Sequence, residues 1–178
     1  MRTTGVDYNV DNAIDILSRT PAILRDLLGG LPPEWASANE GPGTWSPYDV
    51  IGHLIHGEKT DWIPRAEIVL GASPDKRFPP FVRDAMLEFS RGKSPDELLR
   101  EFSALRVENL RKLKAFQLTD ETLAKKGIHP EFGEVTLRQH LATWVAHDLS
   151  HISQVVRVLA RQYRGEVGPW IKYLSILD

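Results

Sequence analysis

The sequence contains no cysteine. This absence excludes disulfide bonds, a cysteine nucleophile and any cysteine-ligated zinc site, so a bound metal would need nitrogen and oxygen ligands. The chain also has no apolar run approaching the ~20 residues of a membrane span. Its N-terminal residues lack the apolar core of a signal peptide. We therefore expect no membrane partner and a cytoplasmic location.

A strong charge of either sign is missing as well. The 178 residues include 22 Lys and Arg and 24 Asp and Glu, which gives a net charge of -2. Nucleic-acid binding usually needs a broader basic footprint than the Arg111-Lys112 and Lys125-Lys126 clusters provide, so we expect no nucleic-acid partner. There is no repeat, low-complexity tract or linker. The length fits one soluble domain over 1–178 that can bury a core.

Three capping boxes mark helix starts. In each, a hydroxyl residue at the N-cap is followed three residues later by an acid or an amide, and an apolar-periodic stretch comes next. The boxes are Ser46-Pro47-Tyr48-Asp49, Ser94-Pro95-Asp96-Glu97 and Thr136-Leu137-Arg138-Gln139. An all-α domain is therefore predicted, with long helices over about 7–29, 46–71, 94–116 and 136–163.

Prolines and long connections interrupt this pattern. Pro21 predicts a kink in the first helix or a restart capped by Thr20, and Pro64 predicts a bend near the middle of the second. The connections 72–93 and 117–135 are long, and such loops often carry function or structure of their own. Within them we expect a short helix around 81–90 and a small hairpin of 124–128 with 133–136. A short closing helix is expected to begin at Gly168-Pro169-Trp170.

His147 and His151 are four residues apart on the last predicted helix. They would project from one face, roughly 5–6 Å apart at Cβ, which lets both bind one metal ion. By helical angle they flank the apolar stripe around Leu141, which suits ligands facing a cleft. Histidines at a stripe edge also commonly make single hydrogen bonds, so a structural role stays open. His140 lies two turns before His147 and is expected to be structural or supporting.

A working metal site needs at least a third protein ligand. His53 and His56 on the second helix diverge by about 60°. His53 lies closer to the apolar edge and is preferred, whereas His56 is expected to point further out. Glu58 and Asp61 could add an oxygen ligand or a base, although a solvated helix face is the commoner role for such residues. His129, in a loop, is expected to be exposed.

Asp148 points to nearly the same side of its helix as Leu141. A carboxylate in an apolar stripe is costly unless a hydrogen-bonding partner awaits it. Two interpretations stay open: Asp148 orients a ligand imidazole through its free N–H, or it is a structural residue meeting a backbone group or an arginine. A Ser150–His151–Asp148 relay is disfavoured because adjacent helical residues point about 100° apart.

In this order and spacing the residues resemble the DinB-like superfamily. The motifs are Trp45-Ser46-Pro47-x-Asp49-x-x-x-His53-Leu54, Glu58-x-x-Asp61-Trp62 and His147-Asp148-x-x-His151-x-x-Gln154. The resemblance extends from Leu31-Pro32 to Gly168-Pro169-Trp170. It implies a four-helix bundle with an up-down-down-up arrangement, a metal site of His53, His147 and His151, and a homodimer. Relatives include thiol transferases, mycothiol-dependent isomerases of maleylpyruvate and metal-dependent hydrolases of unknown substrate.

Three neutral imidazoles suit zinc, nickel or ferrous iron, with zinc slightly favoured. In an open site such a metal is a Lewis acid that lowers the pKa of bound water towards about 7, or it binds a thiol as thiolate. We therefore expect a metal-dependent hydrolase or thiol transferase acting on a small molecule. Asp148, Glu58 or the bound hydroxide would serve as the base. The alternative is a non-catalytic bundle that binds a metal or ligand.

Overall fold

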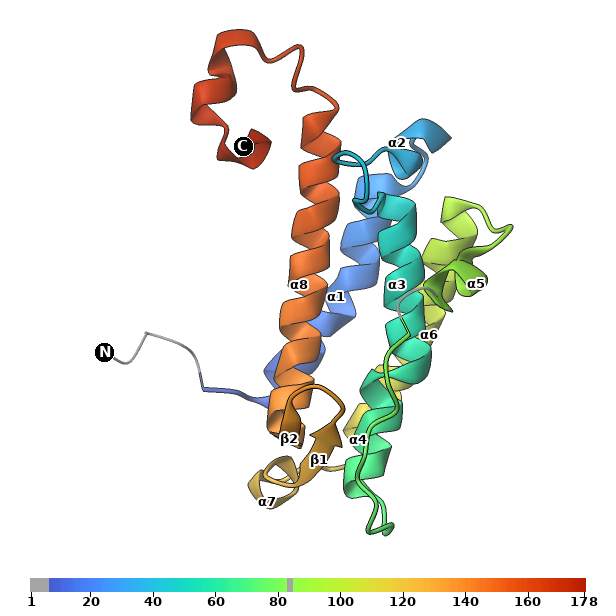
Figure 1. Ribbon diagram of the computed structural model, residues 1–178, viewed down its shortest axis with the longest axis vertical. Coiled ribbons are helices and arrows are strands. Elements are labelled where there is room, and N and C mark those ends of the chain that lie inside the picture. The colour runs from blue at the N-terminus through green and yellow to red at the C-terminus, as the bar shows by residue number, and fades with distance from the viewer. Residues whose placement is uncertain (1–6, 83–84) are drawn as a thin grey trace.

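The computed structural model describes residues 7–82 and 85–178, and most of them are helical (Figure 1). Four long elements form a bundle: α1 (Val10–Leu28), α3 (Pro47–Thr60) continued by α4 (Trp62–Leu70), α6 (Pro95–Ala115) and α8 (Leu137–Arg161). The smaller elements are α2 (Pro33–Ser37), α5 (Met86–Ser90), α7 (Asp120–Leu123), β1 (Lys126–His129), β2 (Gly133–Thr136) and the 3-10 helices η2 (Gly168–Tyr173) and η3 (Ser175–Leu177).

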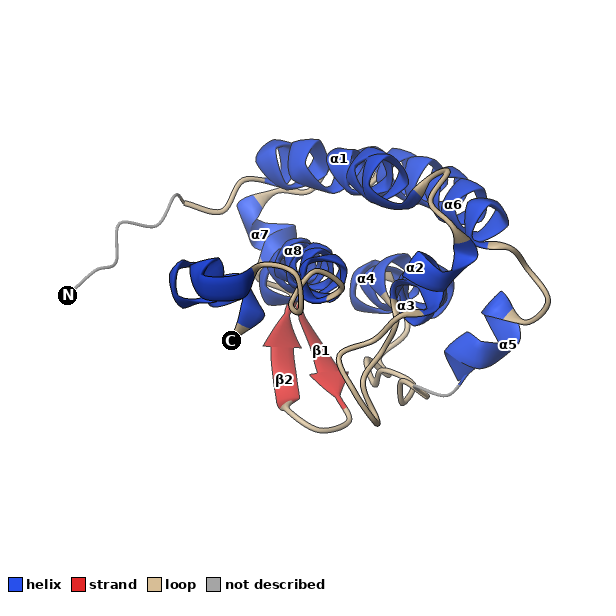
Figure 2. Cartoon of the chain, turned by 90° about the horizontal axis from the view of Figure 1, so that it is seen from above, coloured by secondary structure: helices blue, strands red, loops and turns tan. Residues whose placement is uncertain are grey.

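The long helices run up, down, down and up (Figure 1). Seen from above, α1 and α6 form one layer, and α3 and α8 form the other (Figure 2). Because α3 and α6 point the same way, the chain must return along the bundle between them, and residues 71–94 make this crossover. The predicted four-helix fold with its small hairpin is confirmed.

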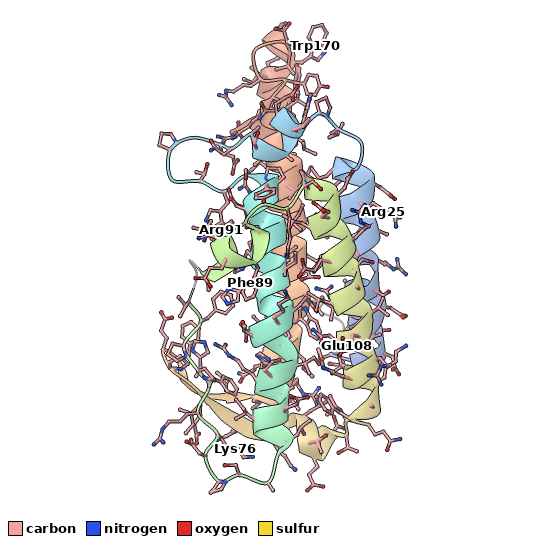
Figure 3. The ribbon with its side chains drawn as sticks, turned by 90° about the vertical axis from the view of Figure 1, so that its right-hand side faces the viewer. Arg25, Lys76, Phe89, Arg91, Glu108 and Trp170 are labelled. Atoms are coloured by element: carbon pink, nitrogen blue, oxygen red, sulfur yellow. The ribbon has the colours of Figure 1, made fainter. Side chains whose placement is uncertain are left out.

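The capping boxes start the helices where predicted. Ser46, Ser94 and Thr136 each accept the backbone N–H three residues later, while the side chain of that later residue accepts the cap's own N–H. Charged residues cover the outer faces of α1 and α6, where Arg25 and Glu108 point to solvent (Figure 3). The predicted short helix around 81–90 is observed as α5, although residues 83–84 lie outside the described part.

The two internal prolines have different outcomes. Helix α1 continues through Pro21 as one element, so the predicted restart at Thr20 is wrong. The second predicted helix does break, but at Asp61 (φ -111°, ψ -73°), which separates α3 from α4. Pro64 accounts for the position of the break because it has no N–H to bond the carbonyl of Thr60 four residues earlier.

The hairpin ties the two long connections together. Strands β1 and β2 pair antiparallel from Lys126↔Thr136 to His129↔Gly133. The backbone of Ile128 also bonds the crossover, accepting from Phe78 N–H at 2.9 Å and donating to the Lys76 carbonyl at 2.8 Å. A side chain at Gly127 would meet the Phe78 ring at 2.3 Å, so only glycine fits this approach. Both connections are thereby held at the same side of α8.

The core has two apolar clusters with a polar layer between them. One cluster surrounds Leu17, Trp62 and Trp144, and the other surrounds Ile51 and Phe102. The buried polar layer between them contains Glu58, Arg106, Asn109 and Asp148.

Among the residues that the structure describes, no helix is both long enough and apolar enough to cross a bilayer.

Candidate metal centre

Three histidine side chains converge between α3 and α8. Nε2 of His147 lies 2.9 Å from Nε2 of His53 and 3.2 Å from Nε2 of His151. Zinc–nitrogen distances of 2.0–2.1 Å place two ligands of a tetrahedral site about 3.3 Å apart. The spacing therefore fits a shared metal ion. Within residues 7–82 and 85–178, these three form the one group of histidine or acidic side chains close enough to hold a metal.

Aromatic rings surround the imidazoles. The Trp45 ring lies 4.8 Å from the His53 ring and is nearly parallel to the His151 ring at 6.0 Å. Phe81 meets His53 edge-on at 5.5 Å, and Trp62 meets His147 at 5.1 Å. These contacts pack an aromatic ring against each of the three imidazoles.

The histidines line a cavity of about 940 Å³. Its walls come from the 40–45 segment, α3, α4, the crossover, the hairpin tip and α8, with the charged side chains Glu40, Asp61, Arg65, Glu131 and Arg157. The volume lies near the upper end of the roughly 300–1,000 Å³ typical of small-molecule sites. The cavity can therefore admit a small molecule to the three histidines.

An ion pair holds the 40–45 segment against α8. Arg157 donates from Nε and Nη2 to the two oxygens of Glu40, both at 2.7 Å. These hydrogen bonds lower the pKa of Glu40 despite its partial burial. Since Trp45 follows in the same segment, the pair helps to keep its ring beside His53 and His151.

The His151 imidazole is held in its neutral form, the form that a metal ligand requires. Burial, followed by the nearby His147, lowers the pKa of His151 to about 4. Its Nδ1 lies 2.9 Å from Oε1 of Gln154. A metal ligand must present an unprotonated nitrogen, and the lowered pKa keeps His151 uncharged at neutral pH.

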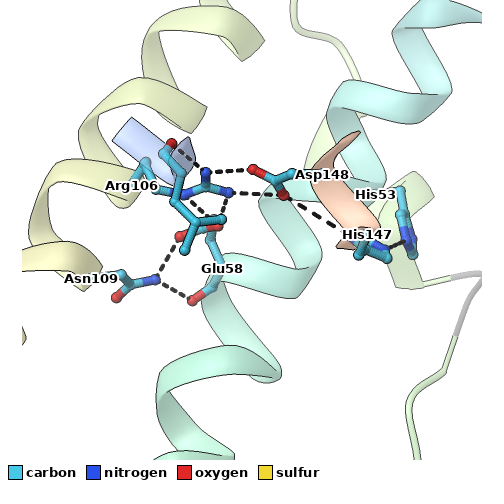
Figure 4. A network of polar contacts seen from close by, with 7 residues as sticks. His53, Glu58, Arg106, Asn109, His147 and Asp148 are labelled. Atoms are coloured by element: carbon cyan, nitrogen blue, oxygen red, sulfur yellow. Dashed lines mark hydrogen bonds and ion pairs between the residues drawn. The ribbon is translucent and has the colours of Figure 1, made fainter. Parts of the chain in front are cut away.

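The carboxylates of Glu58 and Asp148 are buried, and both accept hydrogen bonds from the guanidinium of Arg106 (Figure 4). Arg106 donates to Glu58 Oε1 at 2.7 Å, to the carboxylate of Asp148, and to the Leu17 carbonyl at 2.8 Å. Asn109 donates to Glu58 Oε2 at 2.9 Å. Burial raises the pKa of Glu58. At Asp148 burial also acts to raise the pKa, but the charge of Arg106 and the hydrogen bonds to the carboxylate together outweigh it, and the pKa lies below its usual value.

These contacts correct two expectations about the carboxylates. The exposed fractions of Glu58 and Asp148 are 2% and 0%, and neither side chain lines the cavity. Glu58 is thus not part of a solvated face, and neither carboxylate is placed to act as the base for a substrate. Asp148 has its predicted arginine partner. Its Oδ1 also lies 4.0 Å from Nδ1 of His147, which is beyond hydrogen-bond distance. Nδ1 is nevertheless the nitrogen that an orienting carboxylate would contact, because Nε2 of His147 faces the other two histidines.

The remaining candidates occupy different places. His56 does not point outward as expected: its ring is buried between Phe81 at 4.2 Å and Phe89 at 5.3 Å. Asp61 lines the cavity and pairs with Arg65 Nη1 at 3.0 Å. His129 lies at the cavity rim, half-buried and not exposed, where its Nδ1 accepts the N–H groups of Glu131 and Phe132.

His140 is buried and structural, and it makes the fold sensitive to acid. Its Nε2 donates to the Trp62 carbonyl at 3.0 Å. Burial lowers its pKa, an effect that this hydrogen bond and Asp61 only partly oppose. The unfolded chain therefore binds a proton more readily, so stability is complete above the unfolded pKa of about 6.5 and falls as the pH drops below it.

We expect His140→Gln, which keeps a donor near the position of Nε2 but does not titrate, to weaken this acid sensitivity. Urea unfolding of metal-free protein at pH 7.5 and 5.0 measures the effect. The loss of unfolding free energy on acidification should be smaller in the variant than in the wild type. Equal losses would show that His140 does not contribute.

The sequence comparison assigns the chain to a family. The model of the DinB superfamily matches residues 16–155, a span that includes all three histidines. The chain belongs to the DinB superfamily. The resemblance inferred from the motifs is therefore confirmed. Among curated proteins, none matches the chain.

A solved structure supports the fold of this DinB-superfamily chain. YfiT from Bacillus subtilis superposes with a TM-score of 0.74 at 20% sequence identity, over 91% of this chain and 92% of that one. YfiT is described as a probable metal-dependent hydrolase with an unusual four-helix bundle topology. At this identity the likeness establishes the shared bundle.

Sequence reasoning missed Arg106 and Asn109. Both lie on the buried face of α6, in register with Leu98, Phe102 and Leu113. A charged residue within an apolar stripe was the available signal, since such a group requires a buried partner of opposite charge. It could have indicated a carboxylate on a neighbouring helix.

Proposed function

We propose that this chain is a metal-dependent enzyme that acts on a small molecule, with His53, His147 and His151 as the metal ligands. The convergence of their Nε2 atoms on the wall of a large cavity carries the proposal. A divalent metal bound there would act as a Lewis acid toward water or a thiol. The all-nitrogen ligand set suits zinc, nickel or ferrous iron, with zinc slightly favoured.

The protein contributes the positioning of the ligands and an aromatic lining around them. Helices α3 and α8 hold the ligands on rigid elements, and the rings of Trp45, Trp62 and Phe81 pack against the imidazoles. The same three rings line the cavity from which a substrate approaches. Because the chain has no cysteine, the nucleophile is water or a small cosubstrate.

Two reactions follow from this arrangement. Hydrolysis is supported by the description of YfiT, a structure with the same bundle. Transfer of a low-molecular-weight thiol is supported by the cavity volume of about 940 Å³, which leaves room for a cosubstrate beside an electrophile. We place hydrolysis first because it needs no cosubstrate other than water.

Turnover assays of untagged, metal-free protein reloaded with zinc, nickel or ferrous iron test the proposal. Activated esters and amides are offered alone, and electrophiles are offered with a cellular thiol. We expect turnover that requires the metal and is lost in His147→Ala. Turnover that persists in metal-free protein and in the variant would refute the proposal. Tight metal binding without an exchangeable coordination position or any turnover would favour a non-catalytic binding protein.

A further inference from the structure

Gln154 lies one helical turn after His151 on α8, and its amide oxygen is directed at the imidazole. Oε1 of Gln154 is 2.9 Å from Nδ1 of His151. An amide oxygen can only accept a hydrogen bond, so the proton of the neutral imidazole must be on Nδ1. The other ring nitrogen, Nε2, then carries the lone pair.

This lone pair points into the centre. Nε2 of His151 lies 3.2 Å from Nε2 of His147, which in turn lies 2.9 Å from Nε2 of His53. The opposite tautomer would place an N–H at this point and block coordination, because a ligand nitrogen must be unprotonated. The Gln154 contact therefore selects the tautomer that a cation at the centre requires.

We propose that Gln154 is a positioning residue that holds His151 in its Nδ1–H tautomer and so sets the metal affinity of the site. The inference rests on the proposed metal centre and adds to it a residue that contacts a ligand and not the metal. In other metalloproteins, substitution of a residue that hydrogen-bonds a ligand imidazole typically lowers the metal affinity about 10–100-fold. A similar effect is expected here because His151 is half-buried, with its ring stacked on that of Trp45.

A matched pair of variants separates the acceptor oxygen from the bulk of the side chain. Gln154→Met keeps the length but removes the oxygen, whereas Gln154→Glu keeps an oxygen that can accept from Nδ1–H. Zinc affinity is measured by competition with a chromophoric chelator. We expect affinity to fall about 10–100-fold in Gln154→Met and to match or exceed the wild type in Gln154→Glu. Equal affinities of Gln154→Met and wild type, or equal losses in both variants, would overturn the proposal.

The tautomer itself is read from long-range ¹H–¹⁵N correlations of metal-free protein. The wild type and Gln154→Glu should show His151 protonated on Nδ1, and Gln154→Met should lose this preference. A wild-type His151 protonated on Nε2 would contradict the positioning role even if zinc binds. A wild type that binds none of zinc, nickel and ferrous iron would instead refute the metal centre, and the inference with it, so the two failures are distinguishable.

Discussion

Replacing Arg106 by methionine is expected to lower the free energy of unfolding by about 3–5 kcal/mol. Arg106 is 1% exposed and is the cation that Glu58 and Asp148 share in the core. Without it, two buried carboxylates lose their charged partner, and the Leu17 carbonyl loses a donor. Typical domains are stable by only about 5–15 kcal/mol, so the variant should be close to unfolding.

Arg111→Met is the matched control, because Arg111 is exposed on the same helix. It should change the unfolding free energy by no more than about 0.5 kcal/mol. Adding Glu58→Gln and Asp148→Asn to Arg106→Met should restore part of the loss, since no charge is then left without a partner. Urea unfolding measures all four proteins. A loss in Arg106→Met no larger than in the control would show that the buried network does not stabilise the fold.

Zinc is expected to stabilise the folded chain through the three histidines. A ligand that binds only the folded state adds about 2.7 kcal/mol at a free concentration of 100 Kd. The wild type should therefore show a zinc-dependent rise in unfolding free energy or melting temperature. His147→Ala should abolish most of this rise, because the Nε2 of His147 lies within 3.2 Å of both other ligand nitrogens.

His140→Gln serves as the comparison for zinc-dependent stability. His140 is on the same helix and also borders the cavity, but its Nε2 donates to the Trp62 carbonyl and does not face the centre. This variant should keep the zinc-dependent stabilisation of the wild type. Equal stabilisation of His147→Ala and wild type would locate zinc binding elsewhere on the chain.

Local signals in the sequence located the starts of the helices and the three histidines that converge in the structure. A capping box depends on residues three apart, so Ser46, Ser94 and Thr136 could be identified without tertiary information. The i,i+4 spacing likewise places His147 and His151 together once their helix is accepted. The choice of His53 over His56 used helical angle and agrees with the geometry.

The burial of a helix by several neighbouring elements could not be predicted from such local signals. Residues Val50 to Glu58 of α3 are buried on every side, because α6, α8, α5 and the crossover all pack around this helix. Helical periodicity assumes one exposed face, and it therefore placed His56 and Glu58 outside. The parallel course of α3 and α6 came from the family resemblance, since helix periodicity does not set the direction of a neighbouring helix.

The central claim is that His53, His147 and His151 together hold a divalent metal. Elemental analysis of untagged protein, beside His53→Ala, His151→Ala and the His140→Gln control, tests it most directly. We predict one metal ion per chain in the wild type and the control, and close to none in the two alanine variants. Unchanged metal content in both alanine variants would contradict the account.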